Sequence, residues 1–255
     1  MINPASDSGD RVLLEARHLT KRYEDGVLAL DDLNLQVREK QIYAMLGANG
    51  AGKTTAINLF LNFIEPTSGE ALVDGVATHL DPLYVKTKLA YVSENVMLYP
   101  NFTAVQNLEF FARLAGKENS GEADLKEILL RVGLTESAHH KRLRDFSKGM
   151  RQKCGIAIAI IKDAPAILLD EPTSGLDPKA GREFIDLLTI LRDEGKAILM
   201  STHDIFRARE VADEIGIMSA GRMVIRKRRS ELQGEDLEKL YMTYMAGKQE
   251  TQPFV

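Results

Sequence analysis

A glycine-rich stretch, GANGAGKT at residues 47–54, carries side chains that suit phosphate chemistry. It matches the pattern GxxxxGK followed by Ser or Thr, in which glycines let backbone amides close around phosphate oxygens. In this pattern Lys53 reaches the β- and γ-phosphates, and the hydroxyl of Thr54 binds magnesium. The alternative is a glycine turn with an exposed lysine, which the strand pattern before the loop and the helix pattern after it disfavour. The predicted phosphate-binding residues are Gly47, Asn49, Gly50, Ala51, Gly52, Lys53, Thr54 and Thr55.

Two adjacent acids form a second candidate group for the same chemistry. The apolar run at residues 167–169 ends in Asp170 and Glu171. A carboxylate at the end of a buried strand can hold magnesium through water, which is the predicted role of Asp170. Glu171 beside it can orient or deprotonate an attacking water molecule. Because Pro172 follows, a helix-capping turn is the alternative interpretation of the two acids taken alone.

Short strands and helices must hold these residues in place. Alternating apolar residues over 12–37 predict half-buried strands, so a β-rich lobe opens the chain. The apolar run at 41–46 leads into the glycine-rich stretch, and helical spacing follows over 55–63, which predicts a strand, a loop and a helix. Two further apolar runs, 166–169 and 197–200, predict buried parallel strands.

The segments around these strands are predicted to be mainly helical. A helix near 179–193 joins the two parallel strands into a βαβ unit. Strand signals fade between about 94 and 162, where Thr103 and Gln106 form a candidate capping box and indicate a helical insertion. The remaining predicted elements are a helix over 105–114, a hairpin made of 216–218 and 223–225, and a last helix over about 237–245.

Composition and charge exclude several classes of protein. Lys and Arg number 33 against 37 Asp and Glu, a net charge of -4, so no nucleic acid held by general electrostatic attraction is expected. The single cysteine, Cys154, excludes an internal disulfide framework and a cysteine-rich zinc site. The longest stretch without polar residues, 154–161, is far shorter than the roughly 20 apolar residues that span a bilayer. The first residues lack the features of a secretory signal, so we expect the protein to remain where it is made.

Four motifs in a fixed order make the chain resemble the ATP-binding cassette (ABC) family. They are GANGAGKTT, FSKGM at 146–150, ILLDEPTSGLDP at 167–178 and STH at 201–203. The chain resembles the nucleotide-binding subunit of transporters whose permease is a separate chain, and the likeness covers about residues 12–226. FSKGM departs from the commoner LSGGQ and is similar to the corresponding motif of bacterial ABC-2 type exporters.

The resemblance implies a fold and a set of partners. The fold is α/β, a P-loop NTPase with an ABC ATPase core, an N-terminal antiparallel β lobe and a helical subdomain at about 95–163. A disordered N-terminus, 1–11, and a C-terminal helical tail, 227–255, would flank the domain at 12–226. Such a subunit binds ATP and Mg²⁺, pairs head to tail in a homodimer or heterodimer, hydrolyses ATP and drives an integral-membrane permease. It would lie on the cytoplasmic face of the cell membrane.

The resemblance also assigns roles to single residues. Ser147 and Gly149 would face the γ-phosphate of the ATP held by the other subunit, although a capped core helix is the plainer interpretation. Tyr23 would stack on adenine, unless it is simply an aromatic residue on a sheet surface. Asp177 would couple the two ATP sites, and His203 would contact the γ-phosphate beside the catalytic Glu171.

Glu94 departs from the family pattern, which usually has glutamine at this position near magnesium and the attacking water. A carboxylate about 4 Å from one phosphate charge costs roughly 4 kcal/mol at an effective dielectric near 20. Glu94 must therefore bind magnesium, be protonated or point away, and we expect it to join Thr54 and Asp170 as a metal ligand. Lys148 likewise replaces a residue that is often glycine in the family, and it adds a positive charge.

Two other functions remain open at the level of sequence. The first is a soluble ABC ATPase without a permease, serving cofactor assembly or a similar process. The second is a regulatory module that holds ATP with negligible turnover, which the acid at position 94 keeps open. Four aromatic residues lie where the helical lobe of the family receives a helix of the permease, although core packing explains each of them equally well. They are Tyr99, Phe102, Phe110 and Phe111.

Overall fold

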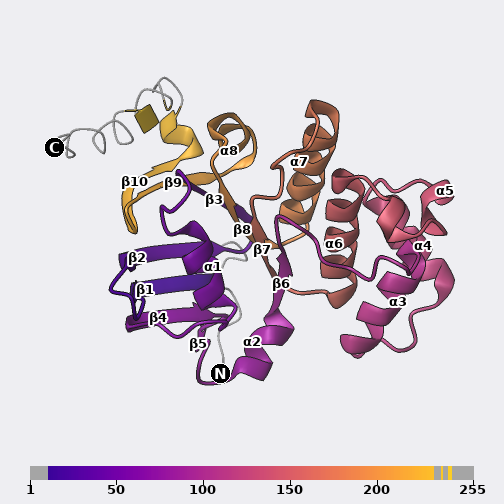
Figure 1. Ribbon diagram of the computed structural model, residues 1–255, viewed down its shortest axis with the longest axis horizontal. Helices are drawn as coiled ribbons and strands as arrows, with labels where there is room; N and C mark the ends of the chain where they lie inside the picture. Colours follow the sequence, from indigo (N-terminus) through magenta and orange to yellow (C-terminus); the bar gives the residue numbers. More distant parts are fainter. Residues whose placement is uncertain (1–10, 233–236, 238–240, 243–255) are drawn as a thin grey trace, which may run out of the picture.

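The computed structural model describes residues 11–232, 237, 241 and 242, and Figure 1 shows their arrangement. The predicted disordered segment and the predicted last helix therefore lie almost wholly outside the described residues. In chain order the elements are β1 (Val12–Arg22), β2 (Leu28–Arg38), β3 (Gln41–Leu46), α1 (Lys53–Phe60), β4 (Ser68–Val73), β5 (Val76–Ala77), α2 (Pro82–Lys88), β6 (Leu89–Val92), α3 (Ala104–Leu114), α4 (Glu122–Arg131), α5 (Glu136–His139), η1 (Leu143–Asp145), α6 (Lys148–Lys162), β7 (Ala166–Asp170), α7 (Pro178–Asp193), β8 (Ala197–Thr202), α8 (Ile205–Val211), β9 (Glu214–Ser219), β10 (Arg222–Arg228) and η2 (Arg229–Leu232).

The strands form two sheets. The first has the order β2-β1-β4-β5 and is antiparallel throughout. The second has the order β10-β9-β3-β8-β7-β6, in which the strands from β9 to β6 are parallel and β10 pairs antiparallel with β9. This arrangement confirms the predicted antiparallel lobe, the βαβ unit and the hairpin. The domain boundary predicted at residue 226 falls inside β10, which continues to Arg228.

Both faces of the parallel strands β9 to β6 are buried, as in other parallel sheets, whereas β10 at the edge is exposed or half-buried. Successive side chains of a strand point to opposite faces. In β3, Ile42 and Ala44 accordingly join one apolar cluster, whereas Tyr43 and Met45 join a second cluster. The first cluster contains residues of α6, α7 and α8, and the second contains residues of α1 and the antiparallel sheet. In Figure 1 the antiparallel sheet and the helices α3 to α6 accordingly lie on opposite sides of the central strands.

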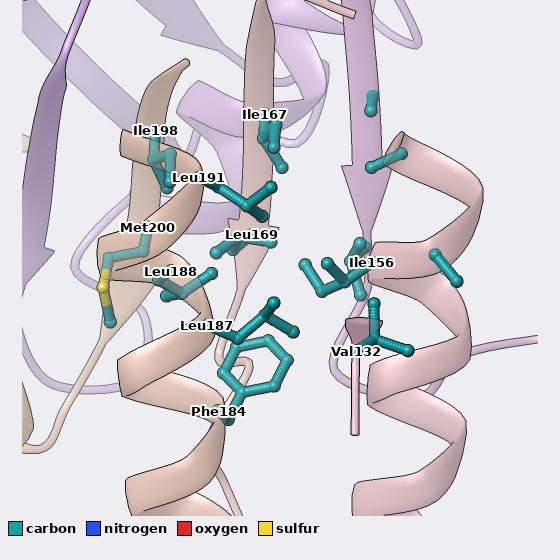
Figure 2. Close-up of a cluster of buried hydrophobic side chains, with 14 of the residues drawn as sticks. Val132, Ile156, Ile167, Leu169, Phe184, Leu187, Leu188, Leu191, Ile198 and Met200 are labelled. Carbon is teal, nitrogen blue, oxygen red and sulfur yellow. The ribbon is translucent and has the colours of Figure 1, made fainter. Parts of the chain in front are cut away.

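The core between β7 and the helices fixes the strand that ends in Asp170. Figure 2 shows Leu188 and Leu191 of α7 beside Ile167 and Leu169 of β7, and all four side chains are at most 1% exposed. Because protein interiors are close-packed, the end of β7 has little freedom to move.

Capping residues mark the positions where the helices begin. Gln106 donates its backbone N–H to Thr103 Oγ1 at 3.2 Å, and Thr103 donates its N–H to Gln106 Oε1 at 2.9 Å, which confirms the predicted capping box of α3. Ser147 caps α6 by accepting a hydrogen bond from the N–H of Met150 at 3.2 Å. Helix α1 begins at Lys53, two residues before the predicted start, since Gly52 forms its cap.

The cysteine of the helical region lies in the core. Cys154 of α6 is fully buried, and burial raises the pKa of its thiol to about 12, as expected for a core residue. Within the described part of the chain, no helix combines the length and the apolar character needed to cross a membrane.

Candidate functional site

The loop between β3 and α1 takes its shape from glycines at points where no side chain fits. A Cβ atom on Gly47 would lie 2.6 Å from the carbonyl oxygen of Met218. Gly52 has φ +101°, and a Cβ atom there would lie 2.5 Å from the carbonyl oxygen of Ala29. A φ in this region strongly favours glycine. The two glycines therefore pack the loop against strands that are remote in sequence.

The loop borders a cavity of about 500 Å³ at the carboxyl ends of β3 and β7. Such edges of parallel sheets are the usual ligand sites of α/β proteins. No motif in the sequence marks residues 27–29 and Ala220 as part of this site. The backbone brings them there, because the N–H of Gly221 donates to the carbonyl of Ala51 at 3.1 Å and the N–H of Asp31 donates to the carbonyl of Gly221 at 3.0 Å. The lining consists of Val27, Leu28, Ala29, Asn49, Gly50, Ala51, Gly52, Lys53, Thr54, Thr55, Glu94, Asp170, Glu171 and Ala220.

Lys53 is the cation of this cavity and is only 5% exposed. Its Nζ donates to the carbonyl oxygens of Gly47 at 2.6 Å and Ala48 at 3.2 Å. The same atom lies 3.3 Å from Glu171 Oε1. Carbonyl dipoles and a carboxylate thus compensate a buried ammonium that could otherwise bind an anion.

Thr54 and Asp170 meet at the base of the cavity, although 116 positions separate them in the sequence. The hydroxyl of Thr54 donates to Asp170 Oδ2 at 3.1 Å, and Ser201 donates its hydroxyl to Asp170 Oδ1 at 2.5 Å. Mg²⁺ prefers oxygen ligands and often takes only one or two from the protein when phosphates supply others. Hydroxyl and carboxylate oxygens at this place fit such an ion.

Glu171 has the geometry of a proton acceptor. Its φ of +47° is unusual for a residue with a side chain, and such strain gathers at functional sites. Oε2 lies 2.8 Å from His203 Nδ1, while the N–H of Glu171 donates to Ser201 Oγ at 2.9 Å. Oε1 is buried and accepts no hydrogen bond from the described residues, although Lys53 lies nearby. This orphaned oxygen is placed to bind a water molecule or a cation.

Glu94 is among the residues that line the cavity, and its carboxylate contacts Ser174 and Lys148, which lie outside the lining. Its Oε1 accepts a hydrogen bond from Ser174 Oγ at 2.9 Å and lies 3.4 Å from Lys148 Nζ. The Ser174 hydroxyl, together with the hydrogen bond and positive charge of Lys148, outweighs burial and lowers the pKa of Glu94. The carboxylate is therefore ionised at neutral pH, which disfavours the protonated alternative. Magnesium binding by Glu94 stays a prediction.

Other predicted site residues lie outside the lining of the cavity. Tyr23 is 37% exposed, and the Nζ of Lys21 lies 5.3 Å from the centre of its ring. Asp177 caps α7 by accepting a hydrogen bond from the N–H of Ala180 at 2.9 Å, and Ser147 and Gly149 lie at the start of α6. Their contacts with adenine or with a second subunit stay predictions.

Comparisons with known proteins show which family the chain belongs to. Residues 30–174 match the family described as ABC transporter. Human retinal-specific phospholipid-transporting ATPase ABCA4 is 39% identical over 214 residues, which cover 81% of this chain but only 9% of that protein. The ABC transporter ATP-binding protein NatA of Bacillus subtilis is 33% identical over 233 residues, which cover 88% of this chain and 94% of NatA.

A solved structure extends the likeness to three dimensions. The ATP-binding cassette MJ0796, in a dimeric post-hydrolysis state bound to ADP and Pi, matches with a TM-score of 0.75 at 30% identity. The match covers 85% of this chain and 99% of that one. The predicted family and fold class are thereby confirmed. With more than half of its length matched by the family and its phosphate loop set at the edge of the parallel sheet, this chain belongs to the ABC transporter family as an ATP-binding P-loop ATPase domain.

Proposed function

We propose that the chain binds Mg²⁺ and ATP, pairs with a second ATPase subunit, and drives a separate integral-membrane permease by hydrolysing ATP. The meeting of Lys53, Thr54, Asp170 and Glu171 around one cavity carries this proposal, because each supplies a different part of phosphoryl chemistry. The cavity volume of about 500 Å³ is within the usual range for small-molecule sites.

Each residue of the cavity would have a different role in hydrolysis. Lys53 would exchange the carbonyls of its own loop for β- and γ-phosphate oxygens, which compensate its charge better. Thr54 and Asp170 would hold Mg²⁺, which would neutralise phosphate charge. Glu171 would orient water and accept its proton, while His203 fixes the other carboxylate oxygen.

A head-to-tail pair of subunits would complete each site. Ser147 caps α6, a helix of 15 residues, and the free amides and dipole at such an end attract phosphate. Gly149 lies in the first turn of this helix, where a Cβ atom would lie 3.3 Å from Ala180 Cβ. The dimeric state of MJ0796 supports pairing of this kind, with either an identical or a different subunit.

The helical region offers an apolar surface to the permease. The ring of Tyr99 lies 5.2 Å from that of Phe102 and 4.7 Å from that of Phe110, and Tyr99 and Phe102 remain 45% and 39% exposed. Beside this cluster, a groove of about 310 Å³ contains Phe111 and Leu114. An amphipathic helix buries its apolar face in such a groove. We therefore propose that a cytoplasmic helix of the permease docks there and holds the subunit on the cytoplasmic face of the membrane.

Purification of the chain from membranes in mild detergent tests this function. We expect an integral-membrane protein to co-purify and the complex to hydrolyse ATP. Leu114→Glu should abolish co-purification, because it places a charge in the groove. Leu130→Glu is the matched control, since Leu130 is also an exposed leucine on a helix but lies on α4, away from the groove. An active ATPase that never co-purifies with a membrane protein would instead support the soluble ATPase, and negligible turnover would support the regulatory module.

A further inference from the structure

Two residues that depart from the family pattern meet at the rim of the cavity. Glu94 follows β6, and Lys148 is the first residue of α6. The Nζ of Lys148 lies 3.4 Å from Glu94 Oε1, although 54 positions separate the residues in the sequence. We propose that Lys148 is the counter-ion of Glu94, a positioning residue that makes an acid at this point compatible with bound ATP. The proposal rests on the proposed Mg·ATP site.

The lining of the cavity carries more acidic than basic side chains, which is why Glu94 requires a counter-ion. Glu94, Asp170 and Glu171 all line the cavity, whereas Lys53 is the only cation among the described lining residues. Lys53 already lies 3.3 Å from Glu171. Around a triphosphate, the negative charges of the lining would thus outnumber its positive charge. Lys148 adds a positive charge beside Glu94, the acid that other members of the family usually lack.

Helix α6 holds Glu94 by its backbone as well as by its side chain. Gln152 is fully buried, and its Nε2 donates to the carbonyl oxygens of Ser93 at 3.2 Å and of Glu94 at 2.8 Å. Lys148 lies four residues before Gln152, so both side chains project from one face of the helix toward the same segment. The hydroxyl of Ser174 binds the same carboxylate oxygen at 2.9 Å. Because α6 fixes the segment that carries Glu94, Lys148 lies within reach of the carboxylate.

A counter-ion role of Lys148 and a direct contact between Lys148 and ATP predict different effects on ATP binding when Lys148 is replaced. If Lys148 acts by compensating Glu94, its loss weakens ATP binding only while the acid is present. If Lys148 instead binds phosphate itself, its loss weakens binding equally when position 94 carries a neutral amide. A purely structural role of Lys148 in α6 would likewise ignore the charge at position 94.

A double-mutant cycle measured by isothermal titration of Mg·ATP separates these possibilities. The four full-length proteins are the wild type, Lys148→Ala, Glu94→Gln and the double variant. We expect Lys148→Ala to raise the Kd about fivefold in the wild-type background, equivalent to about 1 kcal/mol, and less than about twofold beside Glu94→Gln. The same titrations with ATP and a chelator should show a larger effect, since no Mg²⁺ then offsets the acid.

Separate controls test the charge at position 148 and the native fold of each variant. Lys148→Arg keeps the charge and should restore the wild-type Kd, whereas Lys148→Gln should behave like Lys148→Ala. Lys126→Ala is the matched control, because Lys126 forms a comparably exposed pair with Glu122 on α4, at 2.7 Å. This control should leave the Kd unchanged, and thermal unfolding of each variant should confirm a native fold.

Equal effects of Lys148→Ala in both backgrounds, or no effect in either, would overturn the counter-ion role while leaving the proposed function intact. A wild-type chain that does not bind Mg·ATP would overturn the proposed function and, with it, this inference.

Discussion

The carboxylate of Glu171 lies between a lysine and a histidine, and each neighbour engages a different oxygen. Lys53 lies 3.3 Å from Oε1, and His203 lies 2.8 Å from Oε2 through its Nδ1. If Lys53 turned to phosphate oxygens, Oε1 would lose the nearby cation and be open to a water molecule. Nucleotide binding would thus prepare the base for its reaction.

Replacing Lys53 by alanine should abolish useful ATP binding. The cavity then lacks the cation predicted to face the β- and γ-phosphates, and Glu171 Oε1 loses its nearby positive charge. Isothermal titration should show the Kd for Mg·ATP rising at least about 100-fold, which equals about 2.7 kcal/mol. Lys126→Ala, which changes a lysine of α4 outside the cavity, should bind like the wild type. An unchanged Kd in Lys53→Ala would make the glycine-rich loop a structural turn.

Replacing Glu171 by glutamine should stop hydrolysis while ATP binding persists. The amide still forms hydrogen bonds but cannot accept a proton from water, and general-base catalysis typically contributes about 10² to 10⁴ in rate. Steady-state phosphate release measured beside a binding titration checks this expectation. Turnover near that of the wild type would assign the base to another residue.

At the scale of elements, a partly buried acid joins the antiparallel lobe to α2. Asp74 occupies the turn between β4 and β5, and Asp74 and Gly75 both have positive φ, as the hairpin turn Asp-Gly favours. Arg11 Nη2 lies 2.5 Å from its Oδ1, and Tyr84 of α2 donates its hydroxyl to Oδ2 at 2.9 Å. The side chain of Asp74 is only 9% exposed, whereas that of Arg11 is 53% exposed, so the ion pair is partly open to water.

This cluster should make stability depend on acid pH. Burial alone would raise the pKa of Asp74, but the hydrogen bonds from Arg11 and Tyr84 outweigh it and lower the pKa below its ordinary value. A carboxyl with a lowered folded-state pKa stabilises the fold above its unfolded pKa of about 3.9, and this contribution is lost as pH falls through the folded value.

Asp74→Ala should therefore lower the free energy of unfolding by about 1–3 kcal/mol at pH 7. Urea unfolding of both proteins at several pH values should show this difference shrinking below about pH 4. Glu127→Gln, a change to an exposed acid of α4, should lack any comparable effect at pH 7. A difference that is independent of pH would mean that the charge of Asp74 contributes nothing.

At the scale of the whole molecule, the residues assigned to one nucleotide do not all lie in one cavity. Ser147, Gly149 and Asp177 lie outside its lining, at the starts of α6 and α7. A second copy or a related subunit could bring equivalent residues to the open side of the cavity. ATP would then belong to the interface, and its γ-phosphate would favour the closed pair.

ATP should therefore convert Glu171→Gln from monomer to dimer, because this variant retains the γ-phosphate that hydrolysis removes. Light scattering with and without Mg·ATP measures the change in mass. Adding Lys53→Ala to the same variant should keep it monomeric in both conditions, since it no longer binds ATP. Dimerisation of Glu171→Gln that occurs equally without nucleotide would contradict an ATP-dependent interface.

The sequence by itself determined the family, the α/β class and the main strands and helices near the site. These features depend on short-range information. GANGAGKT at 47–54, the acids that follow the apolar run at 167–169, and the capping box of α3 each occupy only a few consecutive residues. Periodicity and local capping suffice to recognise such segments, because the residue types and spacings that mark them lie within a few consecutive positions.

Only the tertiary structure decided which distant side chains meet. The strand order places Thr54 against Asp170 and brings Ala220 to the cavity, while the packing of α6 pairs Lys148 with Glu94. No spacing in the chain encodes these contacts. They depend on how the two faces of the six-stranded sheet bury separate apolar clusters, and so on which strands become neighbours. The positive charge of Lys148 is evident from the sequence, but the orientation of its side chain toward Glu94 follows from the position of α6.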